Sequence, residues 1–388
     1  MIDRVILEKC TGCEACTNIC PKQCIHMRAD AEGFLQPSVD YNLCISCKKC
    51  LNTCPVLNFG RNHSVIDDKK KAYAFRSSSD EFRTISSSGA VFPSLAYPFI
   101  SQGGVVYGAA FDSSFNLKHK RVDERDELPS LMGSKYLQSE IGNTYKVVKK
   151  DISDGKTVLF SGTTCEIEGL KAYLGGNPDR LFCVDLICMG VPSPIAWEKY
   201  KETYFGTENI SSINFKNKHE GWHSFSFHLE RKDGTVFHEN GFENAYFECM
   251  FKGYTLRKSC FTCPYKCESK ISDLTMADCW GCENYASDLD DNRGLSMVIY
   301  HSDKGEKLLQ ILESQGILRE FDYQNVLKYN PYYYQHHVLP DSGRENFFSL
   351  LQTNPKKGFA KYGKNPNKTL TKQIKNGIRG TLRKISGK

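Results

Sequence analysis

The chain has 388 residues, of which 40% are hydrophobic and 12% aromatic, so it is long enough for two or three domains with buried cores. A mean hydropathy of −0.46 and the lack of any apolar run near 18 residues exclude a polytopic membrane protein. The net charge of +6 arises in segment 355–388, which holds eleven Lys or Arg residues and no acid; subtracting those eleven leaves −5 for the rest. The pI of 8.4 is therefore no argument that the body of the chain binds nucleic acid.

The first residues and the cysteines indicate a cytoplasmic metal or redox protein. An acid at Asp3 and the absence of an apolar stretch around it predict no secretory signal. The chain has 18 cysteines, and nine of them lie within residues 10–54. In a reducing compartment, clustered thiols are typical of metal or redox ligands rather than of disulfides.

Residues 1–58 contain one cysteine motif twice. Each copy reads Cys-x2-Cys-x2-Cys-x3-Cys-Pro, the run of bacterial 4Fe-4S ferredoxins, in which the fourth thiolate of each run binds the other cluster. A pair of zinc knuckles would explain neither the Cys-Pro endings nor the crossed fourth ligand. Cys24 lies outside both runs and is expected to be a buried spectator. The predicted ligands of the two 4Fe-4S clusters are Cys10, Cys13, Cys16 and Cys54 for the first, and Cys44, Cys47, Cys50 and Cys20 for the second.

The rest of the chain predicts a larger body behind this ferredoxin-like module. We expect a linker at 59–72, two halves of the body at 73–150 and 151–350, and a separate tail at 351–388. The predicted fold class is α+β, with an α/β-like mixed-sheet body and a small N-terminal bacterial-ferredoxin-like domain.

Several elements of the body are predicted from periodicity. A strand at 157–161, a helix at 165–174 and a strand at 181–187 together predict a βαβ unit. The Asp233-Gly234 turn between alternating segments predicts a hairpin. Residues 306–315 predict an amphipathic helix.

Three short loops rich in Gly, Ser and Thr lie at 86–89, 133–136 and 161–164. The third follows a predicted strand and precedes a helix, where free amides and the helix dipole favour an anion such as a flavin pyrophosphate. Taken alone, each loop is more typical of an ordinary turn. No GxGxxG follows a predicted strand and no GxxxxGK[ST] occurs, which disfavours direct binding of NAD.

Five phrases of the body, in matching order, resemble one known family. They are FRTISSSGAVFPSLA (82–96), MGSKYLQS (132–139), SGTTCEIEGLKAYLG (161–175), DLICMGVPSP (185–194) and SCFTCPYK…SDLTMADCWG (259–281). This pattern resembles the beta subunit family of coenzyme F-420 hydrogenase/dehydrogenase. That family also contains the plant 7-hydroxymethyl chlorophyll reductase and bacterial proteins with an N-terminal dicluster ferredoxin.

The resemblance implies an FAD and a third cluster in the body. Lys135 is implied to stabilise the reduced, anionic flavin and is the first catalytic candidate. The implied flavin contacts are Ser86, Ser87, Ser88, Gly89, Gly133, Ser134, Lys135, Tyr136, Thr163 and Thr164, and the implied ligands of the third 4Fe-4S cluster are Cys165, Cys188, Cys260 and Cys263.

Two departures from the family pattern leave alternatives open. The segment 260–282 adds Cys267, Cys279 and Cys282, so that two CxxC pairs also fit a zinc ribbon, and a thiol cluster without metal is a third alternative. Met189 stands where relatives often carry a histidine, and a thioether cannot donate a proton. The remaining candidates for a protonic role are Asp185, His119 and Tyr136, although a lone His119 is more typical of a hydrogen-bonded structural residue.

These parts predict an iron–sulfur flavoprotein oxidoreductase, since a flavin converts between the single electrons of clusters and the two electrons of an organic reaction. We expect low-potential electrons from a ferredoxin-like donor to reach a small organic substrate, which by analogy belongs to cell-surface polysaccharide biosynthesis. The alternatives are a deazaflavin (coenzyme F-420) oxidoreductase and a non-catalytic electron-transfer subunit of a larger complex. The sequence leaves a homo-oligomer open.

The tail at 351–388 predicts either a basic amphipathic helix or a disordered solubilising segment. Apolar residues recur at i+4 among many lysines and arginines, a pattern that favours an anionic membrane surface at the inner face of the membrane. Only two aromatic residues accompany these charges, so we expect no nucleic-acid partner.

Overall fold

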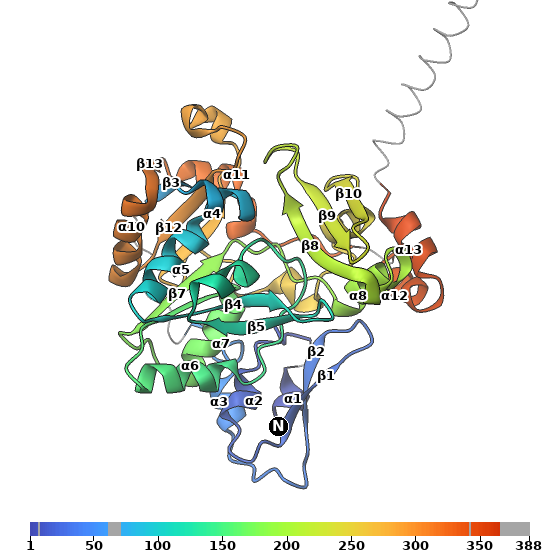
Figure 1. Ribbon diagram of the computed structural model, residues 1–388. Helices are drawn as coiled ribbons and strands as arrows, with labels where there is room; N and C mark the ends of the chain where they lie inside the picture. Colours follow the sequence, from blue (N-terminus) through green and yellow to red (C-terminus); the bar gives the residue numbers. More distant parts are fainter. Residues whose placement is uncertain (7, 61–70, 341–342, 365–388) are drawn as a thin grey trace, which may run out of the picture.

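The computed structural model describes residues 1–6, 8–60, 71–340 and 343–364, and Figure 1 shows their arrangement. A large body sits above a small N-terminal lobe, drawn in blue. Most of the predicted linker 59–72 and residues 365–388 of the predicted tail lie outside the described residues. Residues 351–362 do not form a separate tail as expected: they are largely helical, and Leu351, Phe359 and Tyr362 are buried in a core of the body. No helix in the described part of the chain has the length and apolar character needed to cross a membrane.

An eight-stranded mixed sheet forms the centre of the body and confirms the predicted fold class. Strands β4, β6, β7 and β11 are mutually parallel, whereas the other strands add antiparallel edges. In spatial order the strands are β13 (Gly316–Phe321), β3 (Ala72–Ser77), β12 (Ser296–Tyr300), β11 (Leu274–Asp278), β7 (Leu181–Leu186), β6 (Val158–Gly162), β4 (Val105–Phe111) and β5 (Leu117–Val122).

Alternating side chains of these strands build a core on each face of the sheet. Val106, Leu159 and Val184 pack on one face, against α5 (Val91–Ser101) and α10 (Asp303–Gln315). Their neighbours, such as Val158 and Phe160, pack on the opposite face against α6 (Thr144–Ser153) and α7 (Thr164–Leu174). β6, α7 and β7 form the predicted βαβ unit, and α10 confirms the predicted amphipathic helix.

A second sheet of three antiparallel strands lies beside the first (Figure 1). It contains the predicted hairpin, in which β9 and β10 pair across the Asp233-Gly234 turn. An aromatic core that includes Trp197 and Phe247 joins this sheet to the nearby helices. The elements are β8 (Ile210–Asn217), β9 (Ser226–Arg231), β10 (Val236–Asn240), α8 (Pro194–Tyr204), α9 (Ala245–Phe251), α12 (Gly343–Thr353) and α13 (Pro355–Tyr362).

The remaining helices of the body are short. α4 (Asp80–Ile85) follows β3, α11 (Gln324–Tyr329) follows β13, and the 3₁₀ helices η1 (Arg125–Leu131) and η3 (Lys258–Thr262) belong to connecting segments. Three more short 3₁₀ turns, at Thr207–Asn209, Cys282–Asn284 and Ser287–Leu289, precede β8 and β12, and a fourth at Pro331–Tyr333 follows α11.

The N-terminal module has the two-fold repeated layout that its sequence predicts. Each cysteine run ends in a short helix, α2 (Ala15–Ile19) or α3 (Lys49–Thr53), and each helix is preceded by a residue in the left-handed conformation. The hairpin of β1 (Ile25–Ala29) and β2 (Leu35–Val39) and the short helix α1 (Ile2–Val5) complete the module. Its small core consists largely of cysteine and isoleucine side chains.

A buried arginine fastens the module to the body. The Arg257 guanidinium donates hydrogen bonds to the carbonyl oxygens of Cys10 (2.7 Å) and Leu35 (2.8 Å) and to Gln138 Oε1 (3.0 Å). Because its donors are spread over three partners, Arg257 fixes both the first cysteine loop and the hairpin against the body. Glu14 adds a second anchor, since its carboxylate accepts from the Ile141 and Gly142 amides.

Candidate functional site

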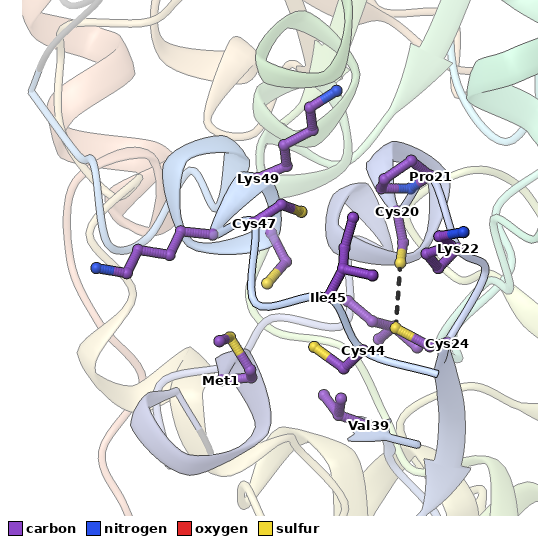
Figure 2. A pocket seen from close by; sticks show the side chains of 13 residues that line it. Met1, Cys20, Pro21, Lys22, Cys24, Val39, Cys44, Ile45, Cys47 and Lys49 are labelled. Atoms are coloured by element: carbon purple, nitrogen blue, oxygen red, sulfur yellow. Dashed lines mark hydrogen bonds between the residues drawn. The ribbon is translucent and has the colours of Figure 1, made fainter. Parts of the chain in front are cut away.

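The second cysteine run lines a pocket at the free end of the module. Cys44, Cys47 and Cys50 share this pocket with Cys20 of the first run, as the crossed-ligand pattern predicts. Figure 2 shows the Cys20, Cys24 and Cys44 side chains converging, and Cys20 Sγ lies 3.4 Å from Cys24 Sγ. Cys24 is buried as expected, and in addition it forms part of the pocket wall.

The first run gathers the complementary set of thiols. Burial raises the pKa of Cys13, and the neighbouring Cys54 and Cys10 raise it further. Burial likewise raises the pKa of Cys16, with contributions from Cys13, Cys10 and Cys54. Four largely buried thiols that repel one another when ionised are suited to a cationic cluster, which neutralises the thiolates as it binds. The structure therefore brings Cys54 to the first run, just as it brings Cys20 to the second.

Gly12 allows the first run to approach the body closely. It has a φ of +74°, and a Cβ atom there would lie 2.1 Å from Gln138 Nε2 and 2.8 Å from Arg257 Nη1. Gly169 of α7 plays the matching part in the body, because its Cβ would lie 3.1 Å from Cys13 Sγ. The Cys13 side chain thus packs directly against the backbone of α7 at Gly169.

A third set of cysteines lines a pocket at the carboxyl ends of the parallel strands. Cys165 follows β6, Cys188 follows β7, and Cys260 and Cys263 belong to η3 and its end. Burial raises the pKa of Cys188 to about 11, with Lys266 opposing and Cys263 adding to this shift. The four residues that the family resemblance implies for a third cluster therefore share one pocket, which we call the body pocket.

The two CxxC pairs of a zinc ribbon are not assembled in one place. Cys279 and Cys282 are buried in a separate apolar core with Trp222 and Leu295, whereas Cys260 and Cys263 line the body pocket. Cys267 donates to the Ser269 carbonyl and is not among the pocket-lining residues.

Across the described residues, no three or more His, Cys, Asp or Glu side chains are grouped so as to hold a single metal ion. Thiolates around a cubane each bind a different iron and so lie farther apart than the ligands of one ion.

Tyr265 lies between the first run and the body pocket. The residue lines the body pocket. Burial raises the pKa of its hydroxyl, and the charges of Cys13, Glu168, Cys165 and Cys54 raise that pKa further. The residue is 2% exposed, and its hydroxyl has no hydrogen-bond partner among the described residues. A buried hydroxyl without a partner costs about 1–3 kcal/mol, which an acceptor bound in the body pocket would recover. This orphaned donor fits a sulfur-rich group held by the four cysteines.

Asp185 supports the wall of the body pocket from behind. Its carboxylate accepts hydrogen bonds from Thr164 Oγ1 (2.6 Å) and Thr275 Oγ1 (2.5 Å), and both threonines line the pocket. The Thr275 hydroxyl also lies 2.8 Å from His301 Nε2. Since Asp185 is fully buried and is not a lining residue, its geometry is that of a residue that positions the two hydroxyls.

Two of the three predicted flavin loops lie side by side. The Ser134 amide donates to Ser87 Oγ (2.6 Å), which joins loop 133–136 to loop 86–89. The third loop instead contributes Thr163 and Thr164 to the body pocket, next to Cys165. Gly89 permits a close backbone contact, because a Cβ atom there would lie 2.2 Å from the Phe75 carbonyl oxygen.

Two lysines with depressed pKa values accompany the joined loops. Burial lowers the pKa of Lys135 to about 7, and its Nζ donates to the Met132 and Gly133 carbonyl oxygens. Burial, followed by the charges of Arg83 and Lys216, lowers the pKa of Lys218 to about 7. Lys218 Nζ donates to the carbonyl oxygens of Arg83, Ser88 and Arg293. An anion bound beside Lys135 and Lys218 would raise the pKa of both amino groups, so that they would gain protons.

The two other protonic candidates have structural contacts. His119 stacks on Phe160 and bonds Ser139 Oγ (2.8 Å), and burial lowers its pKa, so the neutral ring is favoured. Tyr136 packs edge-on against Phe215 and Phe247 of the aromatic core.

Sequence reasoning did not single out Tyr265, Lys218 or Arg257. Tyr265 follows the Cys263-Pro264 pair directly, and that proximity is the one local signal that could have drawn attention to it. Lys218 and Arg257 act across long sequence separations and carry no local signal.

Two family models match parts of the chain. Residues 9–58 match the 4Fe-4S dicluster domain, and residues 155–325 match the family described as the C terminus of the coenzyme F420 hydrogenase/dehydrogenase beta subunit. Among solved structures, the chain is similar to a chain of the F420-reducing [NiFe] hydrogenase complex from Methanosarcina barkeri. The identity is 15% and the TM-score 0.46, over 76% of this chain and 93% of that one. No curated protein matches the chain.

Proposed function

We propose that this chain, in which a 4Fe-4S dicluster domain precedes the C-terminal domain of the coenzyme F420 hydrogenase/dehydrogenase beta subunits, is a flavin-dependent iron–sulfur oxidoreductase. Its two matched domains already make it an iron–sulfur protein of the electron-transfer type. The observation that carries the proposal is the body pocket, where four cysteines from three separate segments meet next to the first cysteine run.

The cysteines would hold three 4Fe-4S clusters. The two runs of the module supply eight ligands, and Cys165, Cys188, Cys260 and Cys263 would hold the third cluster. Tyr265 would donate a hydrogen bond toward this third site, and Lys266 would place a positive charge beside it. Thr11 of the first cysteine loop also lines the body pocket, so that loop forms part of the pocket wall.

The joined loops 86–89 and 133–136 are the proposed site of an FAD. Support comes from the Ser134–Ser87 hydrogen bond, from the two lysines of depressed pKa, and from Ser86 Oγ, which is buried without a partner among the described residues. When bound, the clusters would supply one-electron steps and the flavin a two-electron step.

The part of this chain in that chemistry is to bind and orient these groups and to exclude water. The substrate we infer is a small organic molecule, and its place in cell-surface polysaccharide synthesis rests on analogy with bacterial relatives.

Anaerobic purification followed by iron, sulfide and flavin analysis tests the proposal. We expect about twelve irons, about twelve sulfides and one non-covalent FAD per chain, together with an EPR signal after reduction. About eight irons would remove the third cluster, and a colourless preparation that contains zinc would overturn the assignment altogether. Turnover of a small molecule with a chemical reductant would separate an enzyme from a pure electron-transfer subunit, which would require a second polypeptide.

A further inference from the structure

The outer end of the module combines an exposed cysteine with exposed apolar and basic side chains. Cys47 is exposed, whereas the other cysteines of both runs are buried or half-buried. Beside it, Leu43 and Ile45 are 54% and 57% exposed. Exposed apolar side chains next to a redox ligand are typical of a surface that a partner covers.

Three lysines line the pocket of the second cysteine run. We call them the lysine rim: Lys22, Lys48 and Lys49. All three are exposed and line the pocket of the second run, and Figure 2 shows Lys22 and Lys49 at its edge. No carboxylate is among the described residues that line this pocket. A ring of one sign of charge attracts a partner of the opposite sign over a distance of about 10 Å at ordinary ionic strength.

Several acids of the module are engaged away from the lysine rim, whereas Asp3 and Asp40 lie closer to it: Asp3 accepts from the Tyr41 hydroxyl, and the Asp40 carbonyl accepts from the Leu43 amide. Residues 1–58 hold six basic and six acidic residues, so the lysine rim is not the result of an overall excess of positive charge. Two of the acids face the body: Glu14 accepts from the Ile141 and Gly142 amides, and Glu32 pairs with Arg344. Asp30 caps the turn of the β1–β2 hairpin. Three of the six basic residues of the module, in contrast, form the lysine rim.

We propose that the lysine rim, with Leu43, Ile45 and Cys47, is the docking surface of a small acidic ferredoxin. This inference rests on the proposed function and names the partner of the second cysteine run. The rim would steer the acidic protein, and the apolar pair would exclude water at the centre of the contact. One electron would pass from the ferredoxin, which is oxidised, to the chain, which is reduced, with no bond formed and no proton moved.

Binding of a purified acidic bacterial ferredoxin, measured by calorimetry at low ionic strength, tests the docking surface. The variant Lys22→Glu/Lys49→Glu should raise the dissociation constant about tenfold or more, because two attractions become repulsions. The control Lys232→Glu/Lys307→Glu makes the same charge change on exposed residues of the body and should leave the constant within about twofold of wild type. Added salt should weaken wild-type binding and leave the rim variant little changed.

Two further measurements keep the inference falsifiable. Zero-length carbodiimide cross-linking of the wild-type chain should join ferredoxin carboxylates to rim lysines, and cross-links found only on the body would overturn the proposal. Equal binding by the rim variant and the body control would overturn it as well, as would tighter rim-dependent binding of a flavodoxin or of anionic vesicles than of ferredoxin. Iron analysis of the same preparations judges the proposed function separately, because binding is measured whether or not the clusters are complete.

Discussion

The pocket of the second cysteine run and the body pocket gather the same kind of ligand by opposite means. In the module, Cys44, Cys47 and Cys50 lie within one short segment that leads into α3, and Cys20 of the other run completes the set. In the body, the ligands come from the ends of two parallel strands and from η3, and more than 90 positions separate Cys165 from Cys260. The first pocket depends on a local motif, whereas the second exists only once the sheet has formed.

The two pockets also differ in the residues and elements that surround them. The module pocket opens beside the exposed Cys47 and the lysine rim, where a protein partner can reach it. The body pocket is lined by Tyr265 and Tyr333 among others and lies next to the first cysteine run and to the strand ends where α/β proteins bind ligands. A protein partner can thus reach the pocket of the second run, whereas the body pocket adjoins the first cysteine run.

The largest effect is expected when one cysteine ligand is removed from each pocket in turn. Cys188→Ser should lower the iron content by about four atoms per chain and leave the module clusters intact, because its four ligands are independent of the module. Cys47→Ser should remove a different set of about four irons. Iron analysis and EPR measure both effects. Cys249→Ser, which alters a buried thiol of the aromatic core, is the control and should retain all iron. Loss of iron from the module in the Cys188 variant would contradict the separation.

The contact between the module and the body can be broken at Gly12. Gly12→Ala would force a Cβ atom against Gln138 and Arg257, and we expect a loss of about 1–3 kcal/mol in the free energy of unfolding beyond the cost of the positive φ alone. Gly155→Ala is the matched control, since Gly155 has a φ of +84° and an added Cβ there would meet no described atom within 4 Å. Denaturant titration under anaerobic conditions measures both variants. Equal losses would mean that the close contact contributes nothing to stability.

Removal of the Tyr265 hydroxyl should have a smaller effect, on the midpoint potential of a cluster in the body pocket. Tyr265→Phe removes the only polar atom of this ring and should lower the midpoint potential of the body cluster by about 40 mV, the equivalent of roughly 1 kcal/mol for one electron. A hydrogen bond toward a cluster sulfur favours the more negative, reduced state. EPR-monitored titration provides the measurement, with the cluster of the second run as the internal reference, because Cys13 and Cys54 of the first cluster lie close enough to influence Tyr265. Tyr332→Phe, at another lining tyrosine, should leave the potential in place.

The smallest expected effect concerns the proton balance of the flavin loops. Lys135 and Lys218 have pKa values lowered to about 7, so at pH 8 both are mostly neutral in the flavin-free protein. A bound anion raises a lysine pKa, and FAD binding at pH 8 should therefore take up protons, whereas binding at pH 6 should take up almost none. Calorimetry in buffers of different ionisation enthalpy measures this uptake. Lys135→Met should reduce the uptake, and an unchanged value in that variant would remove Lys135 from the flavin site.

The same pKa values predict how stability depends on pH. A lysine whose folded pKa lies below its unfolded value binds fewer protons when folded, so unfolding takes up protons between about pH 7 and pH 10. These two lysines therefore make the flavin-free protein more stable as the pH rises through this window.

Much of the fold follows from local patterns in the sequence. The repeated cysteine run determines the dicluster module, because three ligands and the following helix all lie within one short segment. The βαβ unit, the hairpin at Asp233-Gly234 and the helix α10 follow from periodicity and turn chemistry, which act over a few residues. The family resemblance also placed four body cysteines in one set, although spacing alone left a zinc ribbon open.

Other features were decided only by the tertiary structure. Cys279 and Cys282, which follow β11, pack in an apolar core with Met297 and Ile299 of β12, whereas Cys260 and Cys263 line the body pocket. Asp185 alternates to the side of its strand where two threonine hydroxyls lie, so it positions the pocket wall instead of lining it. The surroundings of Tyr265 depend on the packing of the module against the body, because Cys13 and Cys54 of the module lie near it. Sequence patterns determine ligands that lie close along the chain, whereas burial and contacts across long separations arise from packing, which no local pattern encodes.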